Sequence, residues 1–193
     1  MQRLRLSVLL VSFGLLLSAC GVNTIPTLEE QAKAAWSQVQ NQYQRRAELI
    51  PNLVETVRGY ARQERDVLTQ VTEARAKATQ IQVNADQLTD PEAIRRFQEA
   101  QQQLSGALGR LIAVSEAYPD LKSNQNFLAL QSQLEGTENR IAVARRDYIQ
   151  AVQAYNTETR TFPGVLWAKF YGAKPMATFT TTEENQRPPQ VKF

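Results

Sequence analysis

The 193-residue chain contains no histidine and a single cysteine, Cys20. Ser-His-Asp and Cys-His catalysis need histidine, as do the commonest metal sites, while a disulfide or a thiolate zinc site needs further cysteines. These absences exclude the corresponding enzyme classes and any internal disulfide. The sequence therefore predicts no catalytic residue, no metal site and no cofactor, and we expect that the protein is not an enzyme.

Glycine and proline are scarce, with eight of each, and aromatic residues make up only 8% of the chain. Alanine, with 23 residues, and glutamine, with 22, account for nearly a quarter of the sequence. Both residue types suit helices better than strands or turns. Composition therefore predicts an all-α protein, with room for one sizeable core.

The chain also has almost no excess of positive charge when the two arginines near its N-terminus are left out of the count. The whole chain has 22 Lys and Arg against 19 Asp and Glu, but Arg3 and Arg5 precede an apolar run. Without these two arginines the balance is 20 to 19, a net charge of +1. A nearly neutral body offers no broad phosphate-binding face, so we expect no nucleic-acid partner.

The N-terminus has the form of an export signal, because fourteen uncharged residues, 6–19, follow Arg3 and Arg5. This run is shorter than the roughly 20 apolar residues that cross a bilayer. Its end, Leu17-Ser18-Ala19-Cys20, resembles the bacterial lipobox, in which the cysteine thiol receives a diacylglyceryl group and the chain is cut before it.

We therefore predict a lipoprotein signal peptide over residues 1–19, a lipid such as palmitate on Cys20, and an anchor linker over residues 20–26. An ordinary signal peptide and an uncleaved anchor are the alternatives. The expected location is the bacterial cell envelope, on the periplasmic or extracytoplasmic face. Gly21 stands where Asp often marks retention in the inner membrane, so the outer membrane is preferred if the host has one.

Three long segments carry the seven-residue apolar spacing of helical bundles and coiled coils. The first begins at a capping box, Thr27 to Glu30, and keeps its phase across Pro51, where a helix should kink. We expect one long bent helix over about 28–83, rather than two helices folded back on each other. Its stripe is Trp36, Val39, Tyr43, Ala47, Ile50, Val54, Val57, Ala61, Glu64, Leu68 and Val71.

The second helix is expected to start at the N-cap Asp90 and to stop before Pro119. Its stripe is Ile94, Phe97, Gln101, Leu104, Leu108, Leu111, Ser115 and Tyr118. The third helix follows and ends before Phe162. Its stripe is Phe127, Leu130, Leu134, Thr137, Ile141, Ala144, Tyr148, Ala151 and Tyr155. Short connections then give an elongated antiparallel bundle of three long helices.

A short apolar segment, residues 165–171, forms a fourth helix that cannot be stable alone and must dock. It either caps the bundle end, which we favour, or lies on a membrane surface. Residues 173–193 contain few apolar residues and are expected to be a disordered tail.

Several separated motifs together resemble the LemA family, in the order in which that family has them. They are Ala35-Trp36, NQYQRR at 41–46, LIPNLVETV at 49–57, EAR at 73–75, YPDLK at 118–122, LEGTENRIAVARR at 134–146, YNT at 155–157 and FPG at 162–164. The resemblance covers about residues 27–172. It implies an all-helical antiparallel bundle held at the bacterial envelope by its N-terminus, in a family without agreed activity or catalytic residues. Many members have an N-terminal transmembrane helix, whereas this chain has a lipobox.

Polar residues on or beside the stripes are the candidates for an internal network. They are Glu64, Gln101, Glu138, Arg145 and Asn156. A buried charge needs a partner, and Arg145 is the donor that we expect for Glu64. The network either fixes helix register, which we favour, or forms a ligand or proton site.

Three arginine pairs, Arg45-Arg46, Arg95-Arg96 and Arg145-Arg146, also stand out. We expect them on solvated helix faces with carboxylate partners on the same helix, the alternative being contact with anionic lipid.

Two functions from different classes follow from these features. The favoured one is a membrane-anchored scaffold or adaptor that recruits envelope protein partners through exposed helix faces. The alternative is a small-ligand-binding or enzymatic protein that uses core carboxylates, which requires a pocket containing Glu64 or Glu138.

Overall fold

The computed structural model describes residues 21–179, and every regular element within that range is helical. The all-α prediction is therefore confirmed. The elements are α2 (Thr24–Tyr60), α3 (Arg65–Gln80), the 3₁₀ turn η1 (Ala85–Thr89), α4 (Pro91–Val114), the 3₁₀ turn η2 (Ser115–Ala117), α5 (Pro119–Lys122), α6 (Gln125–Glu158) and α7 (Gly164–Tyr171). The signal-peptide and Cys20 predictions lie outside the described residues.

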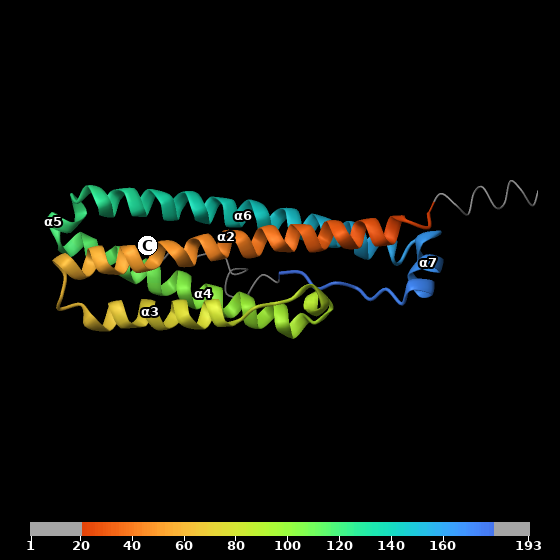
Figure 1. The fold of residues 1–193 in the computed structure, drawn as a ribbon, viewed down its shortest axis with the longest axis horizontal. Helices are drawn as coiled ribbons and strands as arrows, with labels where there is room; N and C mark the ends of the chain where they lie inside the picture. The colour runs from red at the N-terminus through yellow and green to blue at the C-terminus, as the bar shows by residue number, and fades with distance from the viewer. Residues whose placement is uncertain (1–20, 180–193) are drawn as a thin grey trace, which may run out of the picture.

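The long helices form an elongated antiparallel bundle (Figure 1). Helix α6 packs along α2, while α3 packs against both α4 and α2. The start of α2 and helix α7 lie at one end of the bundle, and α5 lies at the opposite end (Figure 1). This arrangement gives the molecule two distinct ends, joined by α2 and α6.

The prediction of one helix over 28–83 is wrong, because the chain turns back between α2 and α3. Helix α2 ends at Tyr60, and α3 begins at Arg65 and runs beside it (Figure 1). The apolar stripe stays in phase through this corner, since both helices bury the same face in one core. Periodicity alone therefore could not reveal the reversal. At the other end, α2 starts at Thr24 rather than after Thr27, so the expected linker residues 24–26 belong to the helix.

Helix α2 continues through Pro51, and an arginine from α3 makes this tolerable. Proline has no N–H, so the carbonyl of Ala47, four residues earlier, loses its helical donor. Arg75 Nε donates to that carbonyl at 2.7 Å. The proline therefore creates an acceptor that the returning helix satisfies, and the bond holds α3 against α2.

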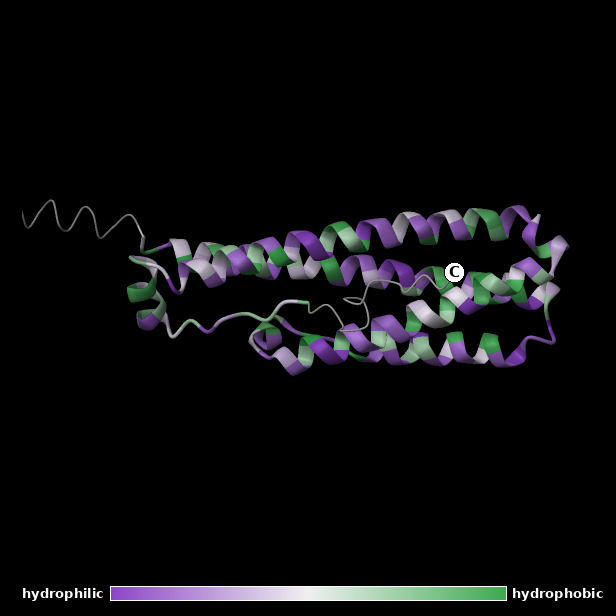
Figure 2. Ribbon diagram, turned by 180° about the vertical axis from the view of Figure 1, so that it is seen from behind, coloured by the Kyte–Doolittle hydropathy of each residue, from purple (hydrophilic) through white to green (hydrophobic). Residues whose placement is uncertain are grey.

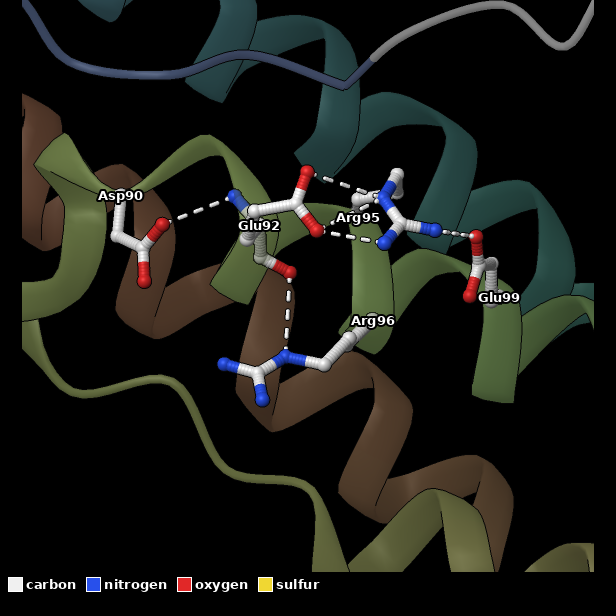
Figure 3. Close-up of polar contacts among 5 residues, drawn as sticks. All are labelled: Asp90, Glu92, Arg95, Arg96 and Glu99. Atoms are coloured by element: carbon white, nitrogen blue, oxygen red, sulfur yellow. Dashed lines mark hydrogen bonds and ion pairs between the residues drawn. The ribbon is translucent and has the colours of Figure 1, made fainter.

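The predicted start of α4 is confirmed. The Asp90 side chain accepts a hydrogen bond from the Glu92 N–H at 2.9 Å, and Pro91 occupies the first helical position. One turn on, Arg95 pairs with Glu92 and Glu99 on the same exposed face (Figure 3). Such exposed pairs stabilise a helix only slightly. The beginning of α4 is thus specified by residues close to it in the sequence.

Two apolar clusters fill the bundle, one towards each end. The cluster near α7 is aromatic, with Trp36 packed against Phe97 and Tyr148 at ring-centroid distances of 5.2 and 5.1 Å. The cluster near α5 is mainly aliphatic, and its fully buried side chains include Leu53 and Leu111. The predicted stripes supply half of the buried residues of the aromatic cluster and most of those of the aliphatic cluster, because they place apolar side chains on one face of each helix.

Residues 173–179 are not a disordered tail but an extended segment that packs on the aromatic cluster. Met176 and Phe179 are buried, and the Phe179 ring lies 5.8 Å from Trp36. The Asn156 side chain makes two hydrogen bonds to the backbone of Met176, each 2.9 Å long. Ala177 adds two hydrogen bonds, because its carbonyl accepts from Tyr148 Oη and its N–H donates to the carbonyl of Leu88, each at 2.7 Å. Residues 180–193 lie outside the described part of the chain.

Across residues 21–179, none of the helices combines the length and the apolar character that crossing a bilayer demands.

We predict that Arg75→Met destabilises the protein more when residue 51 is proline than when it is alanine. In the native chain the substitution should lower the free energy of unfolding by about 1–2 kcal/mol, because the Ala47 carbonyl loses its donor. In a Pro51→Ala background the new N–H can serve that carbonyl, so the cost should shrink by about 1 kcal/mol. Urea unfolding of the four chains measures the coupling. Arg140→Met, at an exposed position on α6, is the control, and equal costs of Arg75→Met in both backgrounds would refute the bond.

We also predict that Asn156→Ala loosens the segment 173–179 around Met176 while leaving the bundle folded. Losing two hydrogen bonds to the backbone should cost about 1–2 kcal/mol and speed amide exchange at Met176. Hydrogen exchange read by NMR or mass spectrometry provides the measurement. Asn139→Ala, at an exposed position on the same helix, should leave exchange at Met176 unchanged.

Candidate functional site

A fully buried arginine, Arg46 on α2, lies at the centre of the most extensive polar contacts in the described core. Its Nη1 donates to Glu138 on α6 at 2.8 Å and to Ser105 on α4 at 2.9 Å. Its Nη2 donates to the side-chain and backbone oxygens of Gln101 on α4, at 2.5 and 3.3 Å. We call these four residues the Arg46 cluster.

The cluster connects all four long helices. Gln101 accepts from Arg46 and donates through Nε2 to the carbonyl of Ala78 on α3, 3.2 Å away. Along the bundle axis it lies between the two apolar clusters. On α2, for example, Tyr43 belongs to the aromatic cluster and Ile50 to the aliphatic one. The core is therefore divided by a polar layer.

The burial of this charge is compensated by nearly complete hydrogen bonding. Four of the five N–H groups of Arg46 have acceptors, and among the described residues only Nε–H has none. The guanidinium also lies 5.0 Å from the centre of the Tyr43 ring. Burial raises the pKa of Tyr43, while the charges of Arg145 and Arg46 oppose that rise. Tyr43 thus keeps its proton at neutral pH and cannot act as a base.

The structure brings together only two of the five predicted network residues, Gln101 and Glu138, and it does so through Arg46. Glu64 lies at the α2–α3 corner, where it accepts a hydrogen bond from Tyr118 Oη at 2.9 Å. That carboxylate raises the pKa of Tyr118. The expected pairing of Glu64 with Arg145 is therefore wrong.

Arg145 and Asn156 instead hold the segment 173–179. The Arg145 guanidinium lies 4.5 Å from the centre of the Phe179 ring, and Asn156 binds the backbone of Met176. Asn156 lies towards the α7 end of the bundle, whereas Arg145 is close enough to Tyr43, at the edge of the Arg46 cluster, to oppose the rise in the pKa of Tyr43. Their roles follow from the packed segment, which the sequence analysis expected to be disordered.

The expectation that the arginine pairs lie on solvated faces is right for Arg95 but wrong for Arg46. Arg95 is exposed and pairs within its own helix, whereas Arg46 is buried and has its partners on α4 and α6. A signal for this was present in the sequence. The positions 36, 39, 43, 46, 50, 53 and 57 alternate in steps of three and four, which places Arg46 on the core face.

The surface of the described residues carries several open grooves. One of about 690 Å³ lies between α2 and α3 towards the α5 end. We call it the α2–α3 groove. Its lining includes Arg58, Arg62 and Arg65 together with Glu55 and Glu73.

Four further grooves have volumes of 190 to 400 Å³, and none of the five is lined by Glu64 or Glu138. Within residues 21–179, no three Asp, Glu, Cys or His side chains come close enough to hold a metal ion.

The geometry of the Arg46 cluster supports a structural role. Its groups largely satisfy one another, while Gln101 also lines a groove of about 260 Å³ between α2, α3 and α4. A buried, hydrogen-bonded charge of this kind disfavours other helix registers, since any shift leaves the guanidinium unpaired.

We predict that Glu138→Gln lowers the free energy of unfolding by about 1–3 kcal/mol, because the buried guanidinium loses its carboxylate. The half-exposed position of Glu138 keeps the cost below that of a fully buried pair. Glu135→Gln, one turn earlier and exposed, should change stability by less than about 0.5 kcal/mol. Chemical denaturation provides both values.

A double-mutant cycle with Arg46→Met isolates the ion pair. The cost of Glu138→Gln should largely disappear once Arg46 is replaced. If the substitution costs as much without Arg46 as with it, the pairing contributes no stability.

Comparison with known proteins places the fold in a family. The model of the LemA family matches residues 35–193. The chain is 28% identical over 177 residues to the magnetosome protein MamQ 2 of Paramagnetospirillum magneticum. That alignment covers 79% of this chain and 65% of the relative. It is 26% identical to the magnetosome protein MamQ of Magnetospirillum gryphiswaldense, covering 81% of this chain and 64% of the relative.

A third relative is the protein LemA of Metamycoplasma hominis, 25% identical over 134 residues, with 69% of this chain and 57% of the relative covered. The chain thus spans less than two thirds of the length of each of these relatives. Because the family model matches well over half of the sequence, including the segments that build the Arg46 cluster and the packed segment 173–179, the chain belongs to the LemA family.

Proposed function

We propose that this LemA-family protein is an adaptor of the bacterial cell envelope, held to a membrane by a lipid on Cys20 and binding envelope proteins through its bundle. One observation carries the proposal. Gly21 lies at one end of the elongated bundle, where the position of its Cβ would be 3.3 Å from the Trp167 indole nitrogen of α7. A lipid on the preceding residue would therefore hold the bundle by that end and leave the other end free.

The competing function, an enzyme or small-ligand protein that uses core carboxylates, has less support. Glu138 is half-exposed and paired with Arg46, and Glu64 is bonded to Tyr118. Neither lines a groove described above. The names of the three relatives describe no reaction, and two of them name magnetosome proteins.

The α2–α3 groove is the surface that we assign to the partner. It lies towards the end of the bundle that a lipid on Cys20 would leave free (Figure 1). Three arginines and two glutamates line it, and Arg58 is already paired with Glu55 at 2.7 Å. The remaining arginines, Arg62 and Arg65, favour an acidic segment of a partner protein.

We predict that the mature protein isolated from membranes lacks residues 1–19 and carries acyl mass, because Cys20 is processed as a lipoprotein cysteine. Intact-mass spectrometry and detergent partitioning measure both properties, with Cys20→Ala as the matched control. The control should keep residues 1–19 and gain no acyl mass. An unmodified Cys20 in the native chain refutes the anchor.

A photo-crosslinking residue at Thr69, in the groove, identifies the partner in membranes of cells that express the acylated protein. Gln133, exposed on α6, is the control position. A defined envelope protein should crosslink at 69 but not at 133, and Arg62→Glu with Arg65→Glu should abolish that product. If the acylated protein yields no such product, the anchor stands and the adaptor function fails.

A further inference from the structure

Large apolar side chains are concentrated on the outer face of α7 and on the turn before it. Phe162, Leu166, Phe170 and Tyr171 are 82%, 58%, 76% and 44% exposed. We call these four residues the apolar tip. The other exposed large apolar residues described are spread singly along α2 and α6, as is normal for a protein surface. Figure 2 shows α7 as a largely hydrophobic helix at the extreme end of the bundle. Such a cluster marks a contact surface.

The inner face of α7 is firmly docked, so the tip is held outwards. Ala168 is buried on this face. At the edge between the two faces, the half-exposed Tyr171 of the tip donates from Oη to the carbonyl of Val22 at 3.3 Å. Gly164 lies so close to Glu158 that a Cβ there would collide with the backbone carbonyl of that residue. The inner face of α7 therefore caps the bundle end, as expected. No described residue covers its outer face, which carries the apolar tip.

The surroundings of the tip indicate what covers it. Gly21, the residue that follows Cys20 in the sequence, lies against Trp167 of α7. Arg160, Lys169 and Lys174 are exposed around the tip. On the nearby first turns of α2, Glu29 and Glu30 both pair with Lys33. Aromatic and aliphatic side chains within a cationic rim match the boundary between acyl chains and anionic head groups.

We propose that the apolar tip inserts into the head-group boundary of the bilayer beside the lipid on Cys20 and provides a second membrane contact. This inference rests on the anchoring proposed above. A single point of attachment leaves a protein free to swivel, whereas two contacts orient it. A protein partner fits less well, because an eight-residue helix is only about 12 Å long and offers far less than the 1,200 Å² or so that a stable interface buries.

The test uses the full-length chain, expressed and acylated, in vesicles of phosphatidylethanolamine and phosphatidylglycerol. A nitroxide is attached at Phe170→Cys in one variant and at Leu128→Cys in another. Leu128 is a matched control because it is 48% exposed and lies at the opposite end of the bundle. Acylation blocks Cys20, so each chain carries one label. Collision with oxygen should exceed collision with a water-soluble nickel chelate at 170, and the order should reverse at 128.

A second variant checks that the tip itself causes insertion. Phe162→Ser with Leu166→Ser should make the label at 170 severalfold more accessible to the nickel chelate, while Val143→Ser should change nothing. Circular dichroism establishes that each chain is folded.

The outcomes separate the two proposals. A water-like label at 170 in protein that carries acyl mass overturns the tip and leaves the anchor intact. A label shielded from both quenchers without vesicles also overturns it, because protein then covers the tip. If Cys20 is unmodified, the proposed anchor fails. Cys20→Ala then leaves position 170 as the only labelled site, and an oxygen-accessible label there still supports the tip.

Discussion

The guanidinium of Arg46 must find its hydrogen-bond partners on other helices, because α2 offers it none in the core. A buried charge without partners destabilises a protein by several kcal/mol, more than any single apolar contact contributes. Glu138 on α6 and Gln101 on α4 supply the acceptors, and Gln101 also reaches α3. One side chain thus makes the positions of three helices depend on that of a fourth. Apolar stripes alone tolerate sliding by one turn, but this layer does not.

A second arginine, Arg75 on α3, also forms a hydrogen bond that holds two helices together. It binds the backbone of α2 rather than side chains. Pro51 leaves the carbonyl of Ala47 without a helical donor, and Arg75 fills that place. The two arginines are complementary. Arg46 extends from α2 to acceptors on α4 and α6, while Arg75 extends from α3 to an acceptor on α2. Together they determine where α3 lies along α2. This explains how a corner as short as residues 61–64, with few apolar contacts of its own, can position a sixteen-residue helix.

The helical class, the cap at Asp90, the third helix and the short α7 were all predictable, because each depends on residues close in sequence. The α2–α3 reversal was not, since the stripe continues in phase on both sides of the corner. The polar site was found only in part. Gln101 and Glu138 stand on or beside stripes, but arginine rarely occupies a core position, so the pair Arg45-Arg46 predicts a solvated face. Its partners lie 55 to 92 residues away, beyond the reach of local patterns.

The hydrogen bonds of Arg46 and Arg75 also affect how the two ends of the bundle are held relative to each other. From Thr24, beside the apolar tip, to Arg58, at the α2–α3 groove, the chain is one uninterrupted helix of about 50 Å. No loop enters this path, so the separation of the two surfaces does not depend on any flexible segment. The Arg46 cluster lies between them and prevents the neighbouring helices from sliding. A protein attached at the tip would therefore hold a partner at a set height above the membrane, which a lipid tether alone cannot do. On this view the buried polar layer serves function through geometry, by keeping two surfaces a constant distance apart rather than by taking part in any reaction.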